Sequence, residues 1–482
     1  MPYNLPKFGA NQNYQFIMEK NSMSNYDRLG FASKLGGLLA AAGSAVGLGN
    51  IWRFPTQAGQ NGGAAFLLVY IAIIFVFGIP LLISEFAIGR HARANVGNAY
   101  SVLAPKSHWK FVGTASVLVA FTIFCYYAVV VGWVAYYIWD AVSGHFVTLG
   151  HEVTTDGSNA FANHFGSFIS NPWKPIVCLA IIMGMMHYVI VSGVQKGIER
   201  VSKLLVPALF IIMLLLVAFA ATMPGAAEGY KFLFSPNFED ITPTVCLSAL
   251  GQCFYSFSLG MGLVTYASYF RRDVNLNRTA LSVGMLDTLV AVLAGLIIFP
   301  AVFSVSGMEP SSGAGLVFIS LPNVFNSALE EIPFLAWLIP LAFYLILFVA
   351  AITSCIFLHE VSTAFLAEKA NISRHKAAAY VTGVGFVIGC CASLSYGPWD
   401  SPIFFGMNFF DFLDYFTAKI ILPLTGLGAA LFVGWKMTTR QLWTELTSDG
   451  RFKFTWIIPF KILTRFVIPV LIIVIMISNF II

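Results

Sequence analysis

Long, nearly uncharged apolar segments recur along the whole chain and restrict what it can fold into. A run of about 18 or more such residues is long enough to cross a bilayer as an α-helix. With 58% hydrophobic and 10% charged residues and a mean hydropathy of +0.79, the chain is more apolar than soluble proteins. We therefore expect an all-α, multi-span membrane protein with about 11 transmembrane helices. The expected spans are residues 35–60, 64–89, 111–140, 174–193, 204–222, 243–269, 279–305, 335–366, 377–396, 408–435 and 456–481.

Lys and Arg residues predict the orientation, because cytoplasmic loops carry an excess of both. All but four of the 27 lie in the N-terminal segment or in every second connection after it. This bias places the N-terminus in the cytoplasm and, with eleven spans, the C-terminus outside. The net charge of +5 reflects the same bias and predicts no nucleic-acid partner. The first 34 residues show no signal-peptide pattern. All seven cysteines lie in expected spans, and both Asn-x-Ser/Thr matches, at Asn277 and Asn371, fall on the cytoplasmic side, so a bacterial inner membrane is favoured over a cell-surface glycoprotein.

Helix-breaking residues interrupt two of the spans at matching places. The first span contains "GSAVGLGNIWRFP" from Gly43 to Pro55, and the sixth contains "SFSLGMG" from Ser256 to Gly262. Paired interruptions of this kind are typical of inverted-repeat transporters, whose broken helices offer backbone groups to ions and substrate. Close packing of helices through small residues is the alternative. Because both clusters are in register and have Asn50 or Ser256 beside them, a binding site is favoured.

The expected organisation is a single membrane domain. Residues 1–34 form a cytoplasmic N-terminal segment, and residues 35–435 form a ten-helix transport core. The core consists of two halves, 35–222 and 243–435. Residues 436–482 form a cytoplasmic loop and the eleventh helix.

These motifs resemble the neurotransmitter:sodium symporter family. "GSAVGLGNIWRFPTQAGQNGGAAFLLVYIAIIFVFGIPLLISEFAIGR" resembles its first two helices, and "GQCFYSFSLGMG" with "TYASYFRRD" resembles its sixth. "KGIERVSKLLVP" is similar to the fifth helix and "AAITSCIFL" to the eighth. The resemblance runs from about Arg28 to the last helix and points to the bacterial amino-acid transporter branch. It implies the leucine-transporter fold, a five-plus-five inverted repeat with broken helices 1 and 6.

The family resemblance also implies two Na+ sites beside a central amino-acid site. The first would use Ala45, Asn50, Ser256 and Asp287 together with the substrate carboxylate. The second would use the carbonyls of Gly43, Val46 and Ala350 and the hydroxyls of Thr353 and Ser354. These hydroxyls could instead bond to their own helix.

Asp287 stands where relatives usually have Asn, and Ala291 where chloride-dependent relatives have Ser. A carboxylate supplies the charge that chloride would bring, so no chloride is expected. A structural, paired role for Asp287 is the alternative reading. Unpaired acids in membrane spans are costly and usually functional, which favours the ion site.

The implied substrate pocket is neutral at its side-chain end. Its residues would be Ala45, Leu48, Gly49, Ile123, Tyr127, Tyr255, Ser256, Ser258, Met261, Ser354 and Leu358. Gly47 replaces an Asp of monoamine-carrying relatives, which predicts a substrate with its own α-carboxylate. Met261 replaces a Phe of leucine-preferring relatives, and flexible Met adapts to several shapes. This favours neutral, hydrophobic to aromatic amino acids, although Met261 could simply fill the core.

Gates on both sides of the site are further implications of the resemblance. An outer gate would pair Arg53 with Asp414, with Gln252 holding Arg53. An inner gate would pair Arg28 with Glu368, with Phe31 beneath it. Such loop pairs are often only weak surface contacts. Gly197 and Pro207 have the spacing that unwinds the fifth helix in relatives, and an ordinary proline kink is the alternative.

Four polar residues in the spans, Glu85, His359, Glu360 and Lys419, have no place in this site. His359 and Glu360 could form a proton path, but a buried, satisfied pair is favoured.

The expected function is sodium-coupled import of neutral amino acids by alternating access. A proton-coupled permease of the same architecture is the alternative, and the oxygen-rich ion sites argue against it. A channel or receptor is disfavoured, because neither a continuous polar stripe nor a signalling domain is visible. No catalytic constellation is found, so an enzyme is not expected. The expected partners are a small amino acid and the lipid bilayer, with the chain a monomer or a weak homodimer.

Overall fold

The computed structural model describes residues 30–150, 159–304, 314–329, 332–402 and 405–481. Within these ranges, nine helical segments are long and apolar enough to cross a membrane. Four are single helices or pairs near the middle of the chain: α7 (Lys110–Val142), α10 (Lys174–Val191), η3 (Val194–Glu199) with α11 (Arg200–Ala220), and α15 (Leu276–Phe303). Two more are α17 (Pro333–Lys369) and α18 (Arg374–Leu394).

The remaining three of these segments contain short π-helical turns. They are α4 (Ala64–Ile73), η2 (Ile74–Gly78) and α5 (Ile79–Ala92); α19 (Phe409–Tyr415), η6 (Phe416–Ile421), α20 (Leu422–Leu431) and η7 (Phe432–Lys436); and α22 (Ile457–Ile462), η8 (Leu463–Val467) and α23 (Ile468–Ile481). The expected all-α membrane fold is therefore confirmed. Short helices occupy the connections: α6 (Val96–Leu103), α8 (His145–Gly150), α9 (Ala160–Ile169), α12 (Ala226–Phe234), η4 (Phe238–Asp240), η5 (Leu316–Ser320), α16 (Leu321–Leu329) and α21 (Thr439–Thr447).

Two further segments are broken, at the places where the glycine clusters occur. The first is α2 (Lys34–Ala45), followed by η1 (Gly49–Arg53) and α3 (Phe54–Gln60), and its two parts are bent by 51°. The second is α13 (Pro243–Ser256) and α14 (Leu263–Ala267). Neither part of the second segment is long enough to span a bilayer by itself, so the count of eleven spans stays a prediction.

The break between α13 and α14 depends on glycine. Ser258, Gly260 and Gly262 have φ values of 51°, 81° and 101°, a region that glycine adopts with little strain. A Cβ on Gly260 would lie 2.6 Å from the Thr425 hydroxyl and 2.9 Å from the Leu422 carbonyl oxygen. Position 260 therefore requires glycine for two reasons: a side chain would clash with its neighbours, and its φ value is one that other residues rarely adopt.

The fifth span begins earlier than the sequence suggested. Residues 196–203 precede the expected span 204–222, although they belong to the motif that resembles the fifth helix, and they are helical from Val194 onward. The Glu199 carboxylate accepts hydrogen bonds from Ala32 N at 2.6 Å and Ser33 Oγ at 2.8 Å, and it pairs with Lys203 at 2.6 Å. Since its charge is matched by these partners, Glu199 is compatible with a buried helix.

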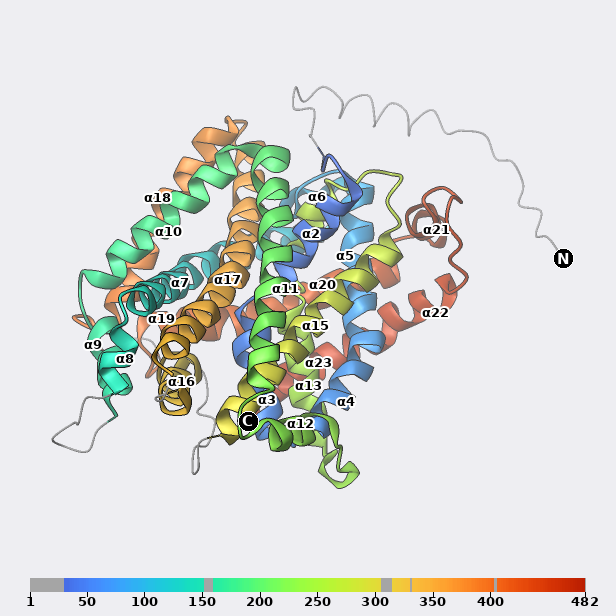
Figure 1. Ribbon diagram of the computed structural model, residues 1–482. Coiled ribbons are helices and arrows are strands. Elements are labelled where there is room, and N and C mark those ends of the chain that lie inside the picture. Colours follow the sequence, from blue (N-terminus) through green and yellow to red (C-terminus); the bar gives the residue numbers. More distant parts are fainter. Residues whose placement is uncertain (1–29, 151–158, 305–313, 330–331, 403–404, 482) are drawn as a thin grey trace, which may run out of the picture.

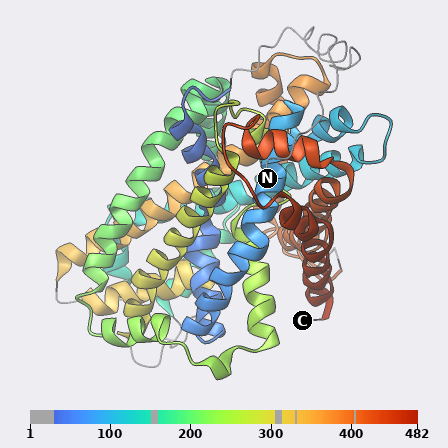
Figure 2. The ribbon, with the colours of Figure 1, turned by 90° about the vertical axis from the view of Figure 1, so that its right-hand side faces the viewer.

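The long helices α7 and α17 pack against each other inside the bundle, with α10 and α18 side by side on one flank (Figure 1). The C-terminal elements α21 and α22 lie on the opposite flank (Figure 1). Figure 2 shows α22 and α23 running along the outside of the bundle. The α20 and α23 helices are in contact, which attaches this flank to the core.

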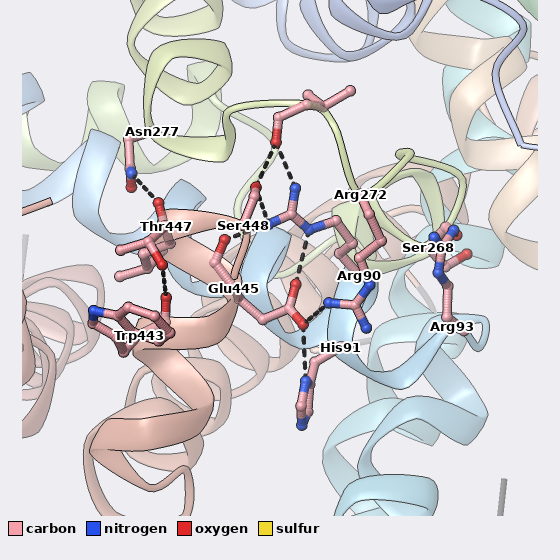
Figure 3. Close-up of polar contacts among 12 residues, drawn as sticks. Arg90, His91, Arg93, Ser268, Arg272, Asn277, Trp443, Glu445, Thr447 and Ser448 are labelled. Atoms are coloured by element: carbon pink, nitrogen blue, oxygen red, sulfur yellow. Dashed lines mark hydrogen bonds and ion pairs between the residues drawn. The ribbon is translucent and has the colours of Figure 1, made fainter. Parts of the chain in front are cut away.

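A buried ionic cluster fixes α21 to the end of α5 (Figure 3). The side chains of Arg90 and Glu445 are both 0% exposed, and Arg90 Nε donates to Glu445 Oε2 at 2.8 Å. His91 Nδ1 lies 2.9 Å from Glu445 Oε1, which Arg272 also contacts. Burial raises the pKa of the Glu445 carboxyl, but the His91 hydrogen bond and the charges of Arg90 and Arg272 outweigh it and lower the pKa from 4.5 to about 2.

Candidate functional site

A cavity of about 670 Å³ lies where the breaks in α2–η1 and α13–α14 face α7, α17 and α19. All of the residues predicted for the substrate pocket line it. They are Ala45, Leu48, Gly49, Ile123, Tyr127, Tyr255, Ser256, Ser258, Met261, Ser354 and Leu358. The broken helices bring residues far apart in sequence to a single cavity, as expected for a site near the middle of the bundle.

Backbone and hydroxyl groups line one part of this cavity. Tyr127 Oη accepts a hydrogen bond from Leu48 N at 3.4 Å. A Cβ on Gly47 would lie 2.8 Å from Ser354 Oγ and 3.4 Å from Tyr127 Oη. A carboxylate side chain at position 47 would therefore require Ser354 to move. The protein therefore places no acidic side chain at this position, and the space beside Gly47 stays free of one.

Four uncharged side chains, Ile123, Met261, Phe357 and Leu358, line the cavity together with the charged residues Arg53, Asp411, Asp414 and Lys419. Phe357 was not among the predicted residues, because on α17 it cannot be distinguished by pattern from its buried neighbours. None of these four side chains carries a charge or a hydrogen-bond donor that could bind a charged substrate side chain.

Three residues predicted for the first Na+ site are in direct contact. Asn50 Nδ2 donates to Ser256 Oγ at 3.0 Å and to Asp287 Oδ1 at 2.8 Å, and Ser256 Oγ donates to Asp287 Oδ2 at 2.8 Å. All three are buried, and Ala45 lines the adjoining cavity. Tyr70, which was not predicted, adds its hydroxyl 3.5 Å from Asp287 Oδ2. The Asn50 amide oxygen accepts a hydrogen bond from Gly47 N at 2.9 Å, so Asn50 faces Ser256 and Asp287 with its amide nitrogen. The oxygens gathered here are therefore the Ser256 hydroxyl and the Asp287 carboxylate, which have the chemistry that a hard cation requires.

The residues predicted for the second Na+ site also converge. Ser354 Oγ lies 3.1 Å from the Val46 carbonyl oxygen, 3.4 Å from that of Gly43 and 3.4 Å from that of Ala350. Thr353 Oγ1 donates to Ala350 O at 3.0 Å and to Val349 O at 3.1 Å. The two hydroxyls do bond to their own helix, as the alternative reading held. Ser354 nevertheless also reaches two carbonyls at the break in the first span, which suits a cation site.

The predicted outer gate is not paired in this conformation. No ion pair within 4.0 Å joins Arg53 to Asp414 among the described residues. The Arg53 guanidinium lies 4.0 Å above the Tyr255 ring, and Asp414 Oδ1 accepts a hydrogen bond from Tyr126 Oη at 2.8 Å. Each partner is thus satisfied by an aromatic side chain instead.

Gln252 contacts the backbone of the first span and not Arg53, the residue that it was predicted to hold. Its Nε2 donates to the Gly49 carbonyl oxygen at 3.0 Å, and its buried Oε1 has no hydrogen-bond partner among the described residues. No hydrogen bond joins it to Arg53 in that part of the chain. Gln252 therefore supports the break in the first span, rather than holding Arg53.

The opposite, predicted cytoplasmic, side of the cavity is closed by aromatic rings. Phe31 is buried, with ring centroids 5.9 Å from Tyr266, 5.8 Å from Tyr269 and 5.7 Å from Phe270. Arg28 lies outside the described residues, so its predicted contact with Glu368 is not described. Glu368 accepts hydrogen bonds from Asn95 and Asn98.

The fifth span is not unwound in this conformation. Gly197 lies in η3 and Pro207 inside α11, which follows it without a gap. A Cβ on Gly197 would lie 2.0 Å from the Val189 carbonyl oxygen, so this glycine is required for a close approach to the end of α10. The predicted unwinding between Gly197 and Pro207 remains a proposal about another state.

The four polar residues left outside the predicted site have partners of their own. The Glu85 carboxylate accepts a hydrogen bond from Gly260 N at 2.7 Å and so braces the broken sixth segment. Glu360 is bound by Arg374 and by Tyr269 Oη at 2.6 Å. His359 Nε2 lies 2.9 Å from Thr382 Oγ1, and Lys419 Nζ lies 5.2 Å from the centroid of the Tyr415 ring. His359 and Glu360 are thus satisfied, as favoured, but by separate neighbours.

The chain matches a known protein family over nearly its whole length. The model of the sodium:neurotransmitter symporter family matches residues 28–157 and 158–482. The uncharacterized sodium-dependent transporter YhdH of Bacillus subtilis (strain 168) is 37% identical over 462 residues, covering 95% of this chain and 98% of the relative. The sodium-dependent neutral amino acid transporter B(0)AT2 of Pongo abelii is 30% identical over 307 residues, covering 58% of this chain and 42% of that protein.

A solved structure has the same fold. It is the crystal structure of MhsT in complex with L-phenylalanine, with a TM-score of 0.82 and 39% sequence identity. The match covers 94% of this chain and 100% of that one. Together with the family match over two consecutive ranges, these comparisons show that the chain is a multi-pass membrane transporter that uses Na+, not an enzyme, and that it belongs to the sodium:neurotransmitter symporter family.

Proposed function

We propose that this protein is a sodium-coupled symporter that imports neutral, hydrophobic to aromatic L-amino acids by alternating access. The single observation that supports this most is that one cavity at the helix breaks is lined by the polar groups of Tyr127, Ser256 and Ser354 and by the uncharged side chains of Ile123, Met261, Phe357 and Leu358. MhsT, which shares the fold, was crystallised with L-phenylalanine, a substrate of this class.

The polar groups suit an α-amino acid. The Tyr127 hydroxyl would donate to the substrate carboxylate, and the start of η1 at Gly49 would direct its positive dipole end toward the same group. Gly47 leaves the space in which the substrate itself would supply the negative charge. The substrate side chain would lie against these uncharged residues. Moving an aromatic side chain from water into this part of the cavity is strongly favourable.

We further propose two Na+ sites and independence from chloride. The first site would be Ala45, Asn50, Ser256 and Asp287, completed by the substrate carboxylate. The second would be Gly43, Val46, Ala350, Thr353 and Ser354. The fixed charge of Asp287 takes the place of a bound anion. Because the substrate carboxylate would itself be a ligand of the first Na+, the ion and the substrate would each raise the affinity for the other.

The transport cycle would then close one side before opening the other. Arg53 would leave the Tyr255 ring and pair with Asp414 above the bound substrate. Loss of the second Na+ would release Ser354 from the carbonyls of the first span, and unwinding between Gly197 and Pro207 would open the cytoplasmic path. We propose a bacterial inner membrane, a cytoplasmic N-terminus, an outside C-terminus, and a monomer or weak homodimer.

Uptake into proteoliposomes tests this proposal. Labelled tryptophan and leucine are offered under an inward Na+ gradient or an equal K+ gradient, in chloride and in gluconate. We expect uptake that requires Na+ and ignores the anion. Uptake that follows a pH gradient without Na+ would instead support the proton-coupled permease and overturn the ion assignment. A preference for charged amino acids would contradict the assignment of the uncharged residues to the substrate side chain.

A further inference from the structure

A second cavity, which shares no lining residue with the transport site, lies between α21 and the start of the last membrane segment. It measures about 280 Å³ and is lined by Thr439, Ile458, Lys461, Ile462, Arg465 and Phe466. Two of these six side chains are cationic and none is acidic, so the cavity has a net positive character. We propose that it binds the phosphate of an anionic phospholipid.

The two cations are held in place by neighbouring backbone and rings. Lys461 Nζ donates to the Met437 carbonyl oxygen at 3.1 Å and to Thr439 Oγ1 at 3.4 Å, which positions the ammonium beside the first turn of α21. The Arg465 guanidinium lies 3.7 Å from the centroid of the Trp435 ring, and Trp435 Nε1 donates to the Arg465 carbonyl oxygen at 3.2 Å. Lys461 and Arg465 are one helical turn apart, so both charges face the same cavity.

Arg465 also carries a donor that the protein does not use. Its Nε is buried and has no hydrogen-bond partner within the described part of the chain. Buried polar groups nearly always have a partner, and leaving one unpaired is costly. A phosphate oxygen in the cavity would supply the missing acceptor, and guanidinium groups suit phosphate geometry well.

The rim of the cavity favours a lipid over a free phosphate ion. Ile458, Ile462 and Phe466 are 68%, 52% and 51% exposed and follow one face of the helix at intervals of four residues. Trp435, 54% exposed, stands beside them, and Trp is enriched at the level of lipid headgroups. An acyl chain would lie along this apolar strip while the phosphate contacts Lys461 and Arg465. Basic pockets between membrane helices are suited to anionic headgroups.

Native mass spectrometry of the delipidated full chain in detergent tests the proposal. The probes are dioleoylphosphatidylglycerol and dioleoylphosphatidylcholine, added separately, with inorganic phosphate as a competitor. We expect one retained phosphatidylglycerol, weak binding of phosphatidylcholine, and no displacement by millimolar phosphate. The variant Lys461→Gln/Arg465→Gln should lose about 25-fold in affinity for phosphatidylglycerol, and Lys461→Gln alone about fivefold, because each cation near a headgroup contributes roughly that factor.

Lys453→Gln is the matched control, since it removes one exposed positive charge from the same connection without touching the cavity. It should bind phosphatidylglycerol as the unaltered chain does. Equal binding of the two lipids, or unchanged binding by the double variant, would overturn the proposal. Displacement by phosphate would also overturn it, in favour of a soluble-anion site. If the double variant does not fold, Lys461→Gln alone decides, because its ammonium contacts only Met437 O and Thr439 Oγ1 among the described hydrogen bonds.

Discussion

Asn50 and Asp287 are joined by two hydrogen bonds from one amide group. Asn50 Nδ2 donates to Asp287 Oδ1 at 2.8 Å and to the Asp287 backbone carbonyl oxygen at 3.0 Å. This contact connects the break in the first span to α15, which lies in the other half of the chain. A cation bound here would therefore contact both halves of the predicted repeat. Its strongest electrostatic attraction would be to the carboxylate of Asp287.

Removing the charge of Asp287 should make transport depend on chloride. Asp287→Asn with Ala291→Ser removes the carboxylate and adds a hydroxyl one turn away. We expect sodium-driven uptake by this double variant to be at least about tenfold slower in gluconate than in chloride, because chloride would replace the lost charge. Ala291→Ser alone should be as indifferent to chloride as the unaltered protein. Equal rates of the double variant in both anions would contradict the role given to Asp287.

The space beside Gly47 predicts a selective loss of substrate affinity. In Gly47→Ala, the new methyl group would lie 2.8 Å from Ser354 Oγ. Overpacking of this size costs about 1–3 kcal/mol, so the KM for the amino acid should rise by about tenfold. Gly184→Ala on α10 is the control, since its Cβ meets nothing within 4 Å. An unchanged KM in Gly47→Ala would show that substrate does not depend on this part of the cavity.

The unpaired outer gate predicts separate effects on binding and transport. Arg53→Gln removes a cation that rests on Tyr255 and would have to pair with Asp414 when the site closes. Equilibrium binding of labelled substrate should therefore fall by less than about threefold, whereas the uptake rate should fall by more than about tenfold. Binding and transport that decline in parallel would place Arg53 in the substrate site instead of the gate.

The two helix breaks were predictable because their signals are local, whereas the cavity residues on the other helices followed only from the family resemblance. Gly43 to Pro55 and Ser256 to Gly262 interrupt apolar runs, and such interruptions have few explanations in a membrane. The partners across the cavity were harder to foresee. Tyr126 and Tyr127 are adjacent, yet Tyr126 contacts Asp414 and Tyr127 contacts Leu48, because successive residues of a helix point about 100° apart.

Other features depend on contacts that a single sequence does not display. Glu85 was recognised as unusual in an apolar span, but its partner is a backbone N–H at Gly260 that becomes free only because the sixth segment is broken. Likewise, the charges near Glu199 left it outside the expected apolar span, and its contacts with Ala32 and Ser33 appear only in the tertiary structure. The sequence thus identifies acidic residues that are unusual in or beside an apolar span. Which groups they bind is determined by the tertiary structure.

The cluster around Glu445 predicts a loss of stability with a definite pH dependence. Glu445→Gln leaves Arg90, His91 and Arg272 without their shared carboxylate, and breaking a buried ion pair costs about 3–5 kcal/mol. Thermal unfolding in detergent at pH 7 should therefore occur at a clearly lower temperature than for the unaltered protein. Glu228→Gln, at an exposed carboxyl, is the control and should unfold like the unaltered chain.

The pH dependence follows from the low pKa of Glu445 in the folded protein. Its pKa is about 2, below the ordinary 4.5, so the unfolded chain binds this proton more readily than the folded one. The stabilisation is therefore fully present above about pH 4.5 and is lost as the pH falls toward 2. The difference in unfolding temperature between Glu445→Gln and the unaltered protein should accordingly shrink on acidification across this range. A difference that stayed constant from pH 7 down to the lowest pH at which the protein remains folded would mean that packing, and not the charge of Glu445, fixes α21 to α5.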